Sequence, residues 1–412
     1  MTTDEDPQPV YLDNASSQAT GWPEIGYEER LWEPSNPLYG PRQDRLAAHG
    51  PYEAAVVSPI AALPVVPLSP ETRLLVSEAS TEIARFDSEI GAEVAPFSSV
   101  LLRSESAASS KIENLTASAK AIALAELGDR SRRNATLIVN NATAMRSAIA
   151  LAKHLDEEAI LRMHEVLLGS FHPQWVGHWR QEQVWIGGSN LSPHRASFVP
   201  PHYERVPAAM GDLVVYLARN DFEPLVQAAV AHAQFETIHP FPDGNGRVGR
   251  ALVHAVLSGK ELTRNVTVPV SAGLPTDLDS YFAALTDYRR GRPEPIVRLM
   301  AEASFSAIGN GRQLVHDLRS TRQSWNLRIK ARSDATAWRV ADLLLQQPVI
   351  DSPAVMSALK VPAMTADRAI STLAGAGVLS KVSGRSRNRK YAASEVLTAI
   401  DAFATRGGRR QR

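Results

Sequence analysis

Cysteine is absent from the 412-residue sequence, which excludes a disulfide framework and a thiolate metal site and fits a reducing compartment. The sequence also lacks an excess of either charge, because 44 Lys and Arg balance 44 Asp and Glu. Net charge therefore draws the protein neither to nucleic acid nor to a membrane surface. The most apolar early segment, residues 54–68, is interrupted by proline and is shorter than the about 20 residues of a membrane span.

The first residues, MTTDEDPQP, are acidic and show no basic and then apolar signal pattern. Together with the missing cysteine, this pattern predicts a cytoplasmic protein that does not enter a membrane.

Helical periodicity dominates the sequence from Pro70 onward, so we predict a mainly α fold with a large core and two or three domains. The segment before it is rich in Pro and polar residues, which is typical of an extended or partly disordered arm. Separate helices are expected at 278–290 and 295–308. The predicted units are an arm at 1–69, a helical region at 70–128, a core at 129–310, a linker helix at 311–332, and a winged-helix-like α+β domain at 333–412.

One segment inside the core lacks helical spacing. Residues 183–188 and 196–201 alternate in a strand-like way, and Gly187, Gly188 and Pro193 mark a turn between them. We predict a small β-hairpin here. A surface ribbon that binds nothing is the alternative.

The strongest local signal is the run His-Pro-Phe-Pro-Asp-Gly-Asn-Gly-Arg-Val-Gly-Arg at residues 239–250. Pro240 disfavours helical geometry at the preceding residue, so His239 is expected at a helix end. Glycines then lead into a new apolar helix, and a helix N-terminus with free N–H groups binds phosphate. Arg247 and Arg250 add charged donors, and Asp243 is a suitable ligand for the Mg²⁺ that accompanies a polyphosphate.

A neutral His239 imidazole can accept the proton of a hydroxyl that attacks phosphorus. A simpler interpretation is a helix-capping turn with a hydrogen-bonded histidine. The same interpretation, packing or hydrogen bonding without a catalytic role, is predicted for His164, His232 and His254.

The run matches every specified position of the motif HPF, two variable residues, GNGR, two variable residues, Arg, and so resembles the Fic (Fic/DOC) family. This resemblance implies a protein adenylyltransferase, in which His239 activates a Ser, Thr or Tyr hydroxyl of a target protein to attack the α-phosphorus of ATP. It further implies that Asp243 holds Mg²⁺ and that Arg250 faces the γ-phosphate. The α- and β-phosphates would lie on Gly244, Asn245, Gly246 and Arg247.

Kinases of this family carry Lys at the position of Gly246, so glycine favours transfer of AMP over transfer of phosphate. The wider resemblance covers about residues 70–310. In it the predicted hairpin corresponds to the family's flap, which pairs with an extended target segment, and Ile186 and Phe198 are the flap residues we single out.

A second pattern of the family, Ser or Thr, three residues, Glu, then Gly or Asn, is matched by Ser109, Glu113 and Asn114. The resemblance implies an inhibitory helix whose Glu113 pairs with Arg250, because one guanidinium cannot serve a carboxylate and a phosphate at the same place. Family members with this glutamate can also remove AMP. An ordinary solvated helix glutamate is the alternative.

The last eighty residues read as three short helices, a strand at 378–382 and a basic turn at 383–390. Nine Lys or Arg lie between residues 381 and 412, which is a pattern that DNA could use. Dimerisation or target docking is an equally open interpretation. The rival function is therefore a DNA-binding transcriptional regulator whose Fic core senses nucleotide. A homodimer fits the resemblance, but no residue specifies it.

Overall fold

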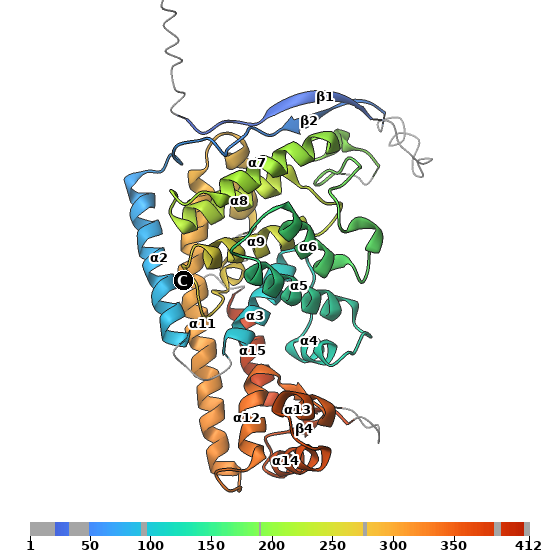
Figure 1. Cartoon of the computed structure of the whole chain (residues 1–412), viewed down its shortest axis with the longest axis vertical. Coiled ribbons are helices and arrows are strands. Elements are labelled where there is room, and N and C mark those ends of the chain that lie inside the picture. Colours follow the sequence, from blue (N-terminus) through green and yellow to red (C-terminus); the bar gives the residue numbers. More distant parts are fainter. Residues whose placement is uncertain are drawn as a thin grey trace, which may run out of the picture.

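The computed structural model (Figure 1) describes residues 21–32, 49–91, 97–188, 191–274, 278–382 and 389–407. Helices dominate this part of the chain, which confirms the mainly α prediction. The first eight are α2 (Pro70–Gly91), α3 (Phe97–Ile112), α4 (Ala119–Glu126), α5 (Arg133–Ala150), α6 (Glu157–Leu168), α7 (Val206–Ala218), α8 (Pro224–Ile238) and α9 (Asn245–Gly259). The others are α10 (Leu278–Arg289), α11 (Glu294–Arg328), α12 (Thr336–Gln346), α13 (Ser352–Leu359), α14 (Ala363–Gly375) and α15 (Ser394–Arg406).

Helix α8 lies at the centre of the fold. Every residue from Leu225 to Ile238 is buried, and four of them are alanines, which let neighbouring helices approach closely. Helix α9 packs along α8, and α7, α10 and α11 also contact α8. Burial on all sides fixes the end of α8, and so fixes the loop that follows it.

The break predicted near residue 309, between two helical segments, is wrong. The expected helix at 295–308 and the connector after it form one continuous helix, Glu294–Arg328, which runs down the molecule in Figure 1. Gly311 does not break it, because the missing side chain makes room for α2: a Cβ there would lie 3.0 Å from Cζ of Phe86. Packing against α2 thus overrides the low helix propensity of glycine.

The N-terminal arm contains a β-ribbon that the sequence did not suggest. Strands β1 (Gly26–Trp32) and β2 (Gly50–Val56) pair antiparallel, from Gly26 opposite Val56 to Trp32 opposite Gly50. The ribbon lies along α7 in Figure 1. Its contacts are with residues far away in the chain, such as the pair of Glu28 with Arg205 at 2.6 Å, so local periodicity did not reveal it. Residues 1–20 and 33–48 of the predicted arm lie outside the described residues.

The predicted hairpin at 183–201 is reduced to one β-bridge between Ile186 and Phe198. Gly187 and Gly188 take positive φ angles of 75° and 74°, and the prolines at 200 and 201 lack the N–H that would extend the ladder. The second limb instead contacts the ribbon, because the N–H of Ala55 donates to the carbonyl of Val199 at 3.1 Å. The flap is therefore a loop that β2 supports.

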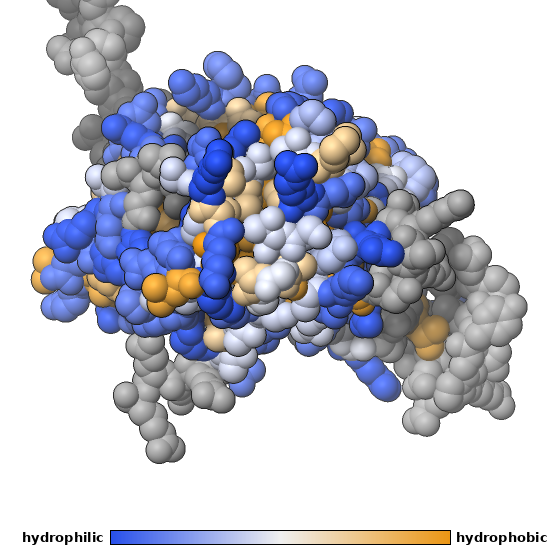
Figure 2. All heavy atoms as spheres, turned by 90° about the horizontal axis from the view of Figure 1, so that it is seen from below, coloured by the Kyte–Doolittle hydropathy of each residue, from blue (hydrophilic) through white to orange (hydrophobic). Residues whose placement is uncertain are grey.

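The C-terminal unit has the three helices α12, α13 and α14 and a small sheet in the order β3 (Val349–Ile350), β5 (Tyr391–Ala392), β4 (Ser380–Lys381). The three helices and strand β4 agree with the elements expected there, whereas β3, β5 and helix α15 were not predicted. The winged-helix assignment itself stays a prediction. Residues 383–388 of the basic turn lie outside the described residues. Figure 2, viewed from the end of the molecule at which this unit lies, shows mainly hydrophilic residues with apolar ones in small separate groups.

The C-terminal unit packs directly on the rest of the protein. Helices α12 and α15 both contact α3, and α15 also contacts α4 and α11. The carboxylate of Asp401 in α15 accepts a hydrogen bond from the N–H of Ala119 at the start of α4. No helix in the described ranges is long and apolar enough to cross a membrane.

Candidate active site

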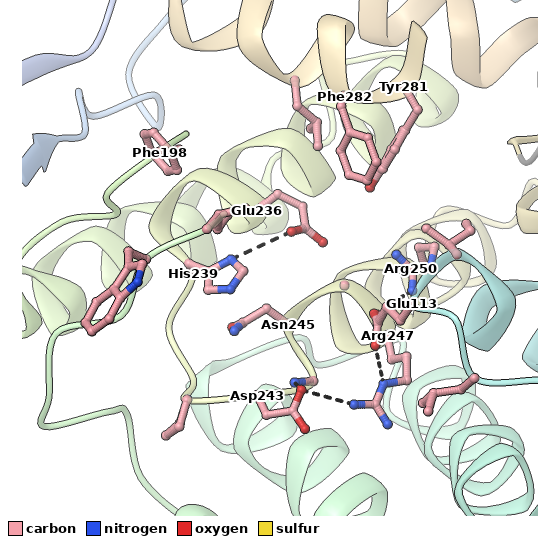
Figure 3. A pocket seen from close by; sticks show the side chains of 18 of the residues that line it. Glu113, Phe198, Glu236, His239, Asp243, Asn245, Arg247, Arg250, Tyr281 and Phe282 are labelled. Atoms are coloured by element: carbon pink, nitrogen blue, oxygen red, sulfur yellow. Dashed lines mark hydrogen bonds and ion pairs between the residues drawn. The ribbon is translucent and has the colours of Figure 1, made fainter. Parts of the chain in front are cut away.

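The predicted site residues, except Ser109 and Asn114, line one cavity of about 880 Å³ (Figure 3). Its walls come from the loop between α8 and α9, the start of α9, the end of α3, helix α10 and the flap. Segments that are more than one hundred residues apart in the chain thus face one space. A cavity of this size can hold a nucleotide-sized ligand.

His239 ends α8 in the left-handed region, with φ 51° and ψ 61°. Its N–H still donates to the carbonyl of Phe235 at 2.8 Å, and Pro240 then prevents the helix from continuing. This turn directs the ring into the cavity (Figure 3). The predicted position of His239 at a helix end is confirmed.

Burial lowers the pKa of His239 to about 3, helped by the positive charges of Arg180 and Arg289. The imidazole is therefore neutral at pH 7, which is the form that accepts a proton. One ring nitrogen, Nδ1, lies 3.8 Å from Oε2 of Glu236. The other ring nitrogen, Nε2, is the one left to face a substrate.

Three side chains hold the loop around His239. The Arg180 guanidinium donates to the carbonyls of His239 at 2.8 Å and Pro201 at 2.6 Å. Asn245 accepts from the N–H of Phe241 and donates to the carbonyl of the same residue. Nε2 of His164 lies 3.0 Å from the carbonyl oxygen of Asp243. These bonds fix the backbone before any ligand arrives.

Asn245 was predicted to bind phosphate, but its side chain instead forms hydrogen bonds with the loop backbone. Both ends of the amide are used by the Phe241 backbone, and the residue is 2% exposed. Its side chain shapes the loop, so only its backbone N–H in the first turn of α9 is placed for a phosphate. The predicted role of His164, His232 and His254 as packed or hydrogen-bonded residues is confirmed.

The start of α9 has the features of a phosphate site. Gly244 precedes it with a φ of 83°, which glycine adopts without strain. Arg247 and Arg250 are 2% and 3% exposed and line the cavity. In the described part of the chain Nη1 of Arg247 is buried and has no hydrogen-bond partner. An oxygen-rich anion would satisfy that donor.

Asp243 is the residue that would hold Mg²⁺. Its side chain is 51% exposed at the cavity, and Oδ1 accepts from the N–H of Gly244 at 2.6 Å. Mg²⁺ is usually held by one or two carboxylates together with substrate phosphates. Asp243 therefore fits a Mg²⁺ ion that is also bound by the phosphates of a nucleotide. Among the described residues there is no group of three or more His, Cys, Asp or Glu side chains that could hold a metal ion by themselves.

Glu113 contacts both arginines of the motif. Oε1 accepts from Nη2 of Arg250 at 2.7 Å, as predicted, and Oε2 accepts from Nε of Arg247 at 2.7 Å. Oε1 also lies against Gly246, where a Cβ would approach it to 2.4 Å. Glu113 thus occupies donors that the sequence analysis predicted for phosphate.

Ser109 and Asn114, the other two residues of the predicted inhibitory pattern, hold Arg250 and shape the turn at Glu113. The hydroxyl of Ser109 accepts from Nε of Arg250 at 2.8 Å, and its carbonyl accepts from Nη2 of the same guanidinium at 2.9 Å. Asn114 follows the end of α3 with a φ of 60°, a conformation that Gly and Asn adopt most easily at a helix end. The turn presents Glu113 to the arginines.

The flap residues line the same cavity as the motif. Ile186 and Phe198 pack with Ile25 and Ala55 in a small apolar cluster, and the Arg289 guanidinium covers the Phe198 ring at 3.7 Å. Phe198 is only 7% exposed. A role in target docking therefore falls to the flap backbone and to Ile186, and it stays a prediction.

Sequence reasoning missed Glu236 and the second partner of Glu113, Arg247. Glu236 is one turn before His239, and a carboxylate in an otherwise apolar helix was the available signal. The pairing with Arg247 had no signal, because it depends on the side-chain packing of α3 against α9.

Residues 154–257 match the sequence model of the Fic/DOC family, so this part of the chain is a Fic domain. It is 32% identical over 166 residues to "Protein adenylyltransferase fic-1" of Caenorhabditis elegans, which covers 38% of this chain and 29% of that protein. It is 30% identical over 158 residues to "Protein adenylyltransferase Fic" of Nematostella vectensis, covering 36% of this chain and 32% of that one. The chain thus spans about a third of the length of these relatives.

The fold also resembles a solved structure. The crystal structure of a Fic family protein from Desulfovibrio desulfuricans G20 aligns with a TM-score of 0.52 at 23% identity, over 80% of this chain and 97% of that chain. This likeness extends well beyond the 104 residues of the family match.

Proposed function

We propose that this protein transfers AMP from ATP to a hydroxyl side chain of a target protein. The observation that carries the proposal is the placement of a neutral His239 and the N-terminus of α9 in one cavity, with Arg247 and Arg250 beside them. Curated relatives that share this domain are named protein adenylyltransferases.

The reaction follows from these positions. The target hydroxyl gives its proton to Nε2 of His239 while its oxygen bonds to the α-phosphorus. The bond between that phosphorus and the bridging oxygen to the β-phosphorus breaks, and pyrophosphate leaves. Backbone N–H groups of α9 and the two arginines hold the phosphates, which positions the reacting atoms. Mg²⁺, when bound at Asp243, neutralises phosphate charge.

We further propose that Glu113 inhibits this reaction. Its carboxylate uses donors of Arg247 and Arg250 that the phosphates of ATP need, and one donor cannot serve a carboxylate and a phosphate at the same place. Replacement of the carboxylate should therefore release activity. Removal of AMP by the wild-type protein would use the same site and is a second outcome to be measured.

The test is intact-mass spectrometry of Glu113→Gly protein after incubation with ATP and Mg²⁺. We expect added mass of one or more AMP groups, and none in the Glu113→Gly, His239→Ala variant. The matched control is Glu113→Gly, His316→Ala, because His316 is exposed on α11. Transfer that survives without His239 would contradict its role as base. If labelled AMP reached neither the protein itself nor any protein of a lysate, the proposed function would be wrong.

The DNA-binding alternative rests on basic residues near the C-terminus, and several of these lie outside the described residues. It stays a prediction, as do a homodimer and a cytoplasmic location.

A further inference from the structure

Glu236 lies beside the catalytic histidine without an evident packing role. It is on the last turn of α8 and is 7% exposed, and it lines the cavity with Oε2 at 3.8 Å from Nδ1 of His239 (Figure 3). Within the described residues Oε1 of Glu236 has no hydrogen-bond partner, and a hydrogen bond to the backbone carbonyl of Glu236 raises the pKa of His239 against the effect of burial. A buried carboxyl group without such partners costs free energy, so its presence needs a reason.

The surroundings of Glu236 are built to accommodate it. A Cβ at residue 249 would lie 3.2 Å from Oε1, so Gly249 of α9 leaves the necessary space. Burial raises the pKa of Glu236 to about 7, and the charge of Glu113 adds to this. The positive charges of Arg250 and Arg289 act in the opposite direction. The remaining titratable neighbours, Tyr281 and His232, are held neutral by burial.

We propose that Glu236 is a positioning residue for His239, whose carboxylate keeps Nδ1 protonated and Nε2 free to take the hydroxyl proton. The inference rests on the proposed AMP transfer. A neutral imidazole carries one proton on either nitrogen, and only the form with hydrogen on Nδ1 offers a lone pair at Nε2. The carboxylate favours that form, since it can accept from Nδ1 but cannot donate to it.

The same carboxylate acts after proton transfer. Once Nε2 has taken the hydroxyl proton, the imidazolium carries a positive charge in a buried site, where it is costly. A negative charge at about 4 Å from the ring offsets that cost.

A pH dependence follows, because the mechanism needs the ionised carboxyl group. In the Glu113→Gly background the rate of AMP transfer should rise with pH as Glu236 loses its proton, with a midpoint below about 7, because this variant lacks the Glu113 charge that raises the pKa of Glu236. In Glu113→Gly, Glu236→Gln the rate should be at least about tenfold lower at pH 7.5, and this rise should be absent. Binding of α,β-methylene-ATP, measured by titration calorimetry, should be unchanged.

The matched control is Glu158→Gln in the same background, since Glu158 is exposed on α6. The melting temperature separates positioning from a structural role. Glu236→Gln should melt at the same or a higher temperature, because it removes a buried charge and keeps the shape. A lower melting temperature together with an unchanged pH profile would mean a structural role and would overturn the proposal.

A second measurement does not need AMP transfer at all. Nitrogen NMR of histidine-labelled full-length protein reports which ring nitrogen is protonated, and His239→Ala identifies the signals of His239. We expect the Nδ1–H form in the wild type and a shift toward the Nε2–H form in Glu236→Gln. A tautomer ratio that this variant leaves unchanged overturns the inference. If Glu113→Gly transfers no AMP while the tautomer shifts, the proposed function fails and the positioning of His239 by Glu236 stands.

Discussion

Oε1 of Glu113 accepts a hydrogen bond from Nη2 of Arg250 at 2.7 Å, across 137 residues of sequence. Arg250 is almost fully buried, and a buried guanidinium needs partners. In this state Glu113 and Ser109 provide them. A polyphosphate would have to replace the carboxylate, so nucleotide binding and this ion pair compete.

The first prediction concerns that competition. ATP with Mg²⁺ should raise the melting temperature of Glu113→Gly more than that of the wild type, because in the wild type ATP must first displace the carboxylate. Thermal unfolding with a series of ATP concentrations measures the difference. Lys111→Gly is a suitable control, since Lys111 is exposed in the same turn. Equal shifts in Glu113→Gly and wild type would contradict the competition.

The second prediction concerns Ser109. Ser109→Ala removes the acceptor of Nε of Arg250, which weakens the arrangement that Glu113 completes by about 1–3 kcal/mol. We expect basal AMP transfer to rise several-fold, though less than in Glu113→Gly. The control is Ser110→Ala, whose hydroxyl accepts from Asn141 and not from an arginine. If both serine variants changed transfer equally, a specific role of Ser109 would be ruled out.

The third prediction concerns Arg180, which is 2% exposed and donates to backbone carbonyls around the site. Lys in its place has its donors on one atom and cannot reach them all. Arg180→Lys should lower the free energy of unfolding by about 2 kcal/mol or more and AMP transfer by at least tenfold. Urea unfolding and the mass assay measure these. Arg162→Lys, at an exposed ion pair of α6, should change neither.

The fourth prediction concerns acid pH and His164. Burial lowers the pKa of His164 to about 4, so between pH 6.5 and 4 the unfolded chain binds a proton that the folded protein does not. Its stabilising contribution is complete above about pH 6.5 and is lost as the pH falls toward 4, by about 3 kcal/mol. Urea unfolding at several pH values measures this loss.

The variant that checks the assignment is His164→Gln, which can still donate to the Asp243 carbonyl but does not titrate. Its free energy of unfolding should fall less between pH 6.5 and 4 than that of the wild type. Burial also lowers the pKa values of His232 and His239, so part of the dependence should remain. His316→Gln, on an exposed position, should behave as wild type. An unchanged slope in His164→Gln would remove His164 as the cause.

The sequence predicted the active-site loop because everything that loop needs is local. A proline that stops a helix, glycines that permit the turn and a helix start that binds anions act within twelve consecutive residues, from His239 to Arg250. Helical periodicity predicted the mainly α fold for the same reason: it is a property of neighbours three and four residues apart.

The contacts of Glu113 were predictable only in part. The spacing of Ser109, Glu113 and Asn114 follows from the end of one helix, where Asn114 takes a left-handed conformation. The arginines that contact Glu113 depend on how α3 packs against α9. Only the structure showed that Arg247 and Arg250 both bind its carboxylate.

Tertiary packing alone decided the rest. Helix α11 continues through Gly311 because α2 packs against it there, and β2 supports the flap through the Ala55 and Val199 backbone. Glu236 is one turn before His239 by local spacing, but its raised pKa arises because α8 is buried on every side. The spacing of residues in the sequence determines on which face of its own helix a residue lies. Burial and charge arise from segments far apart in the chain, and these set the chemistry of His239 and the access of a phosphate to Arg250.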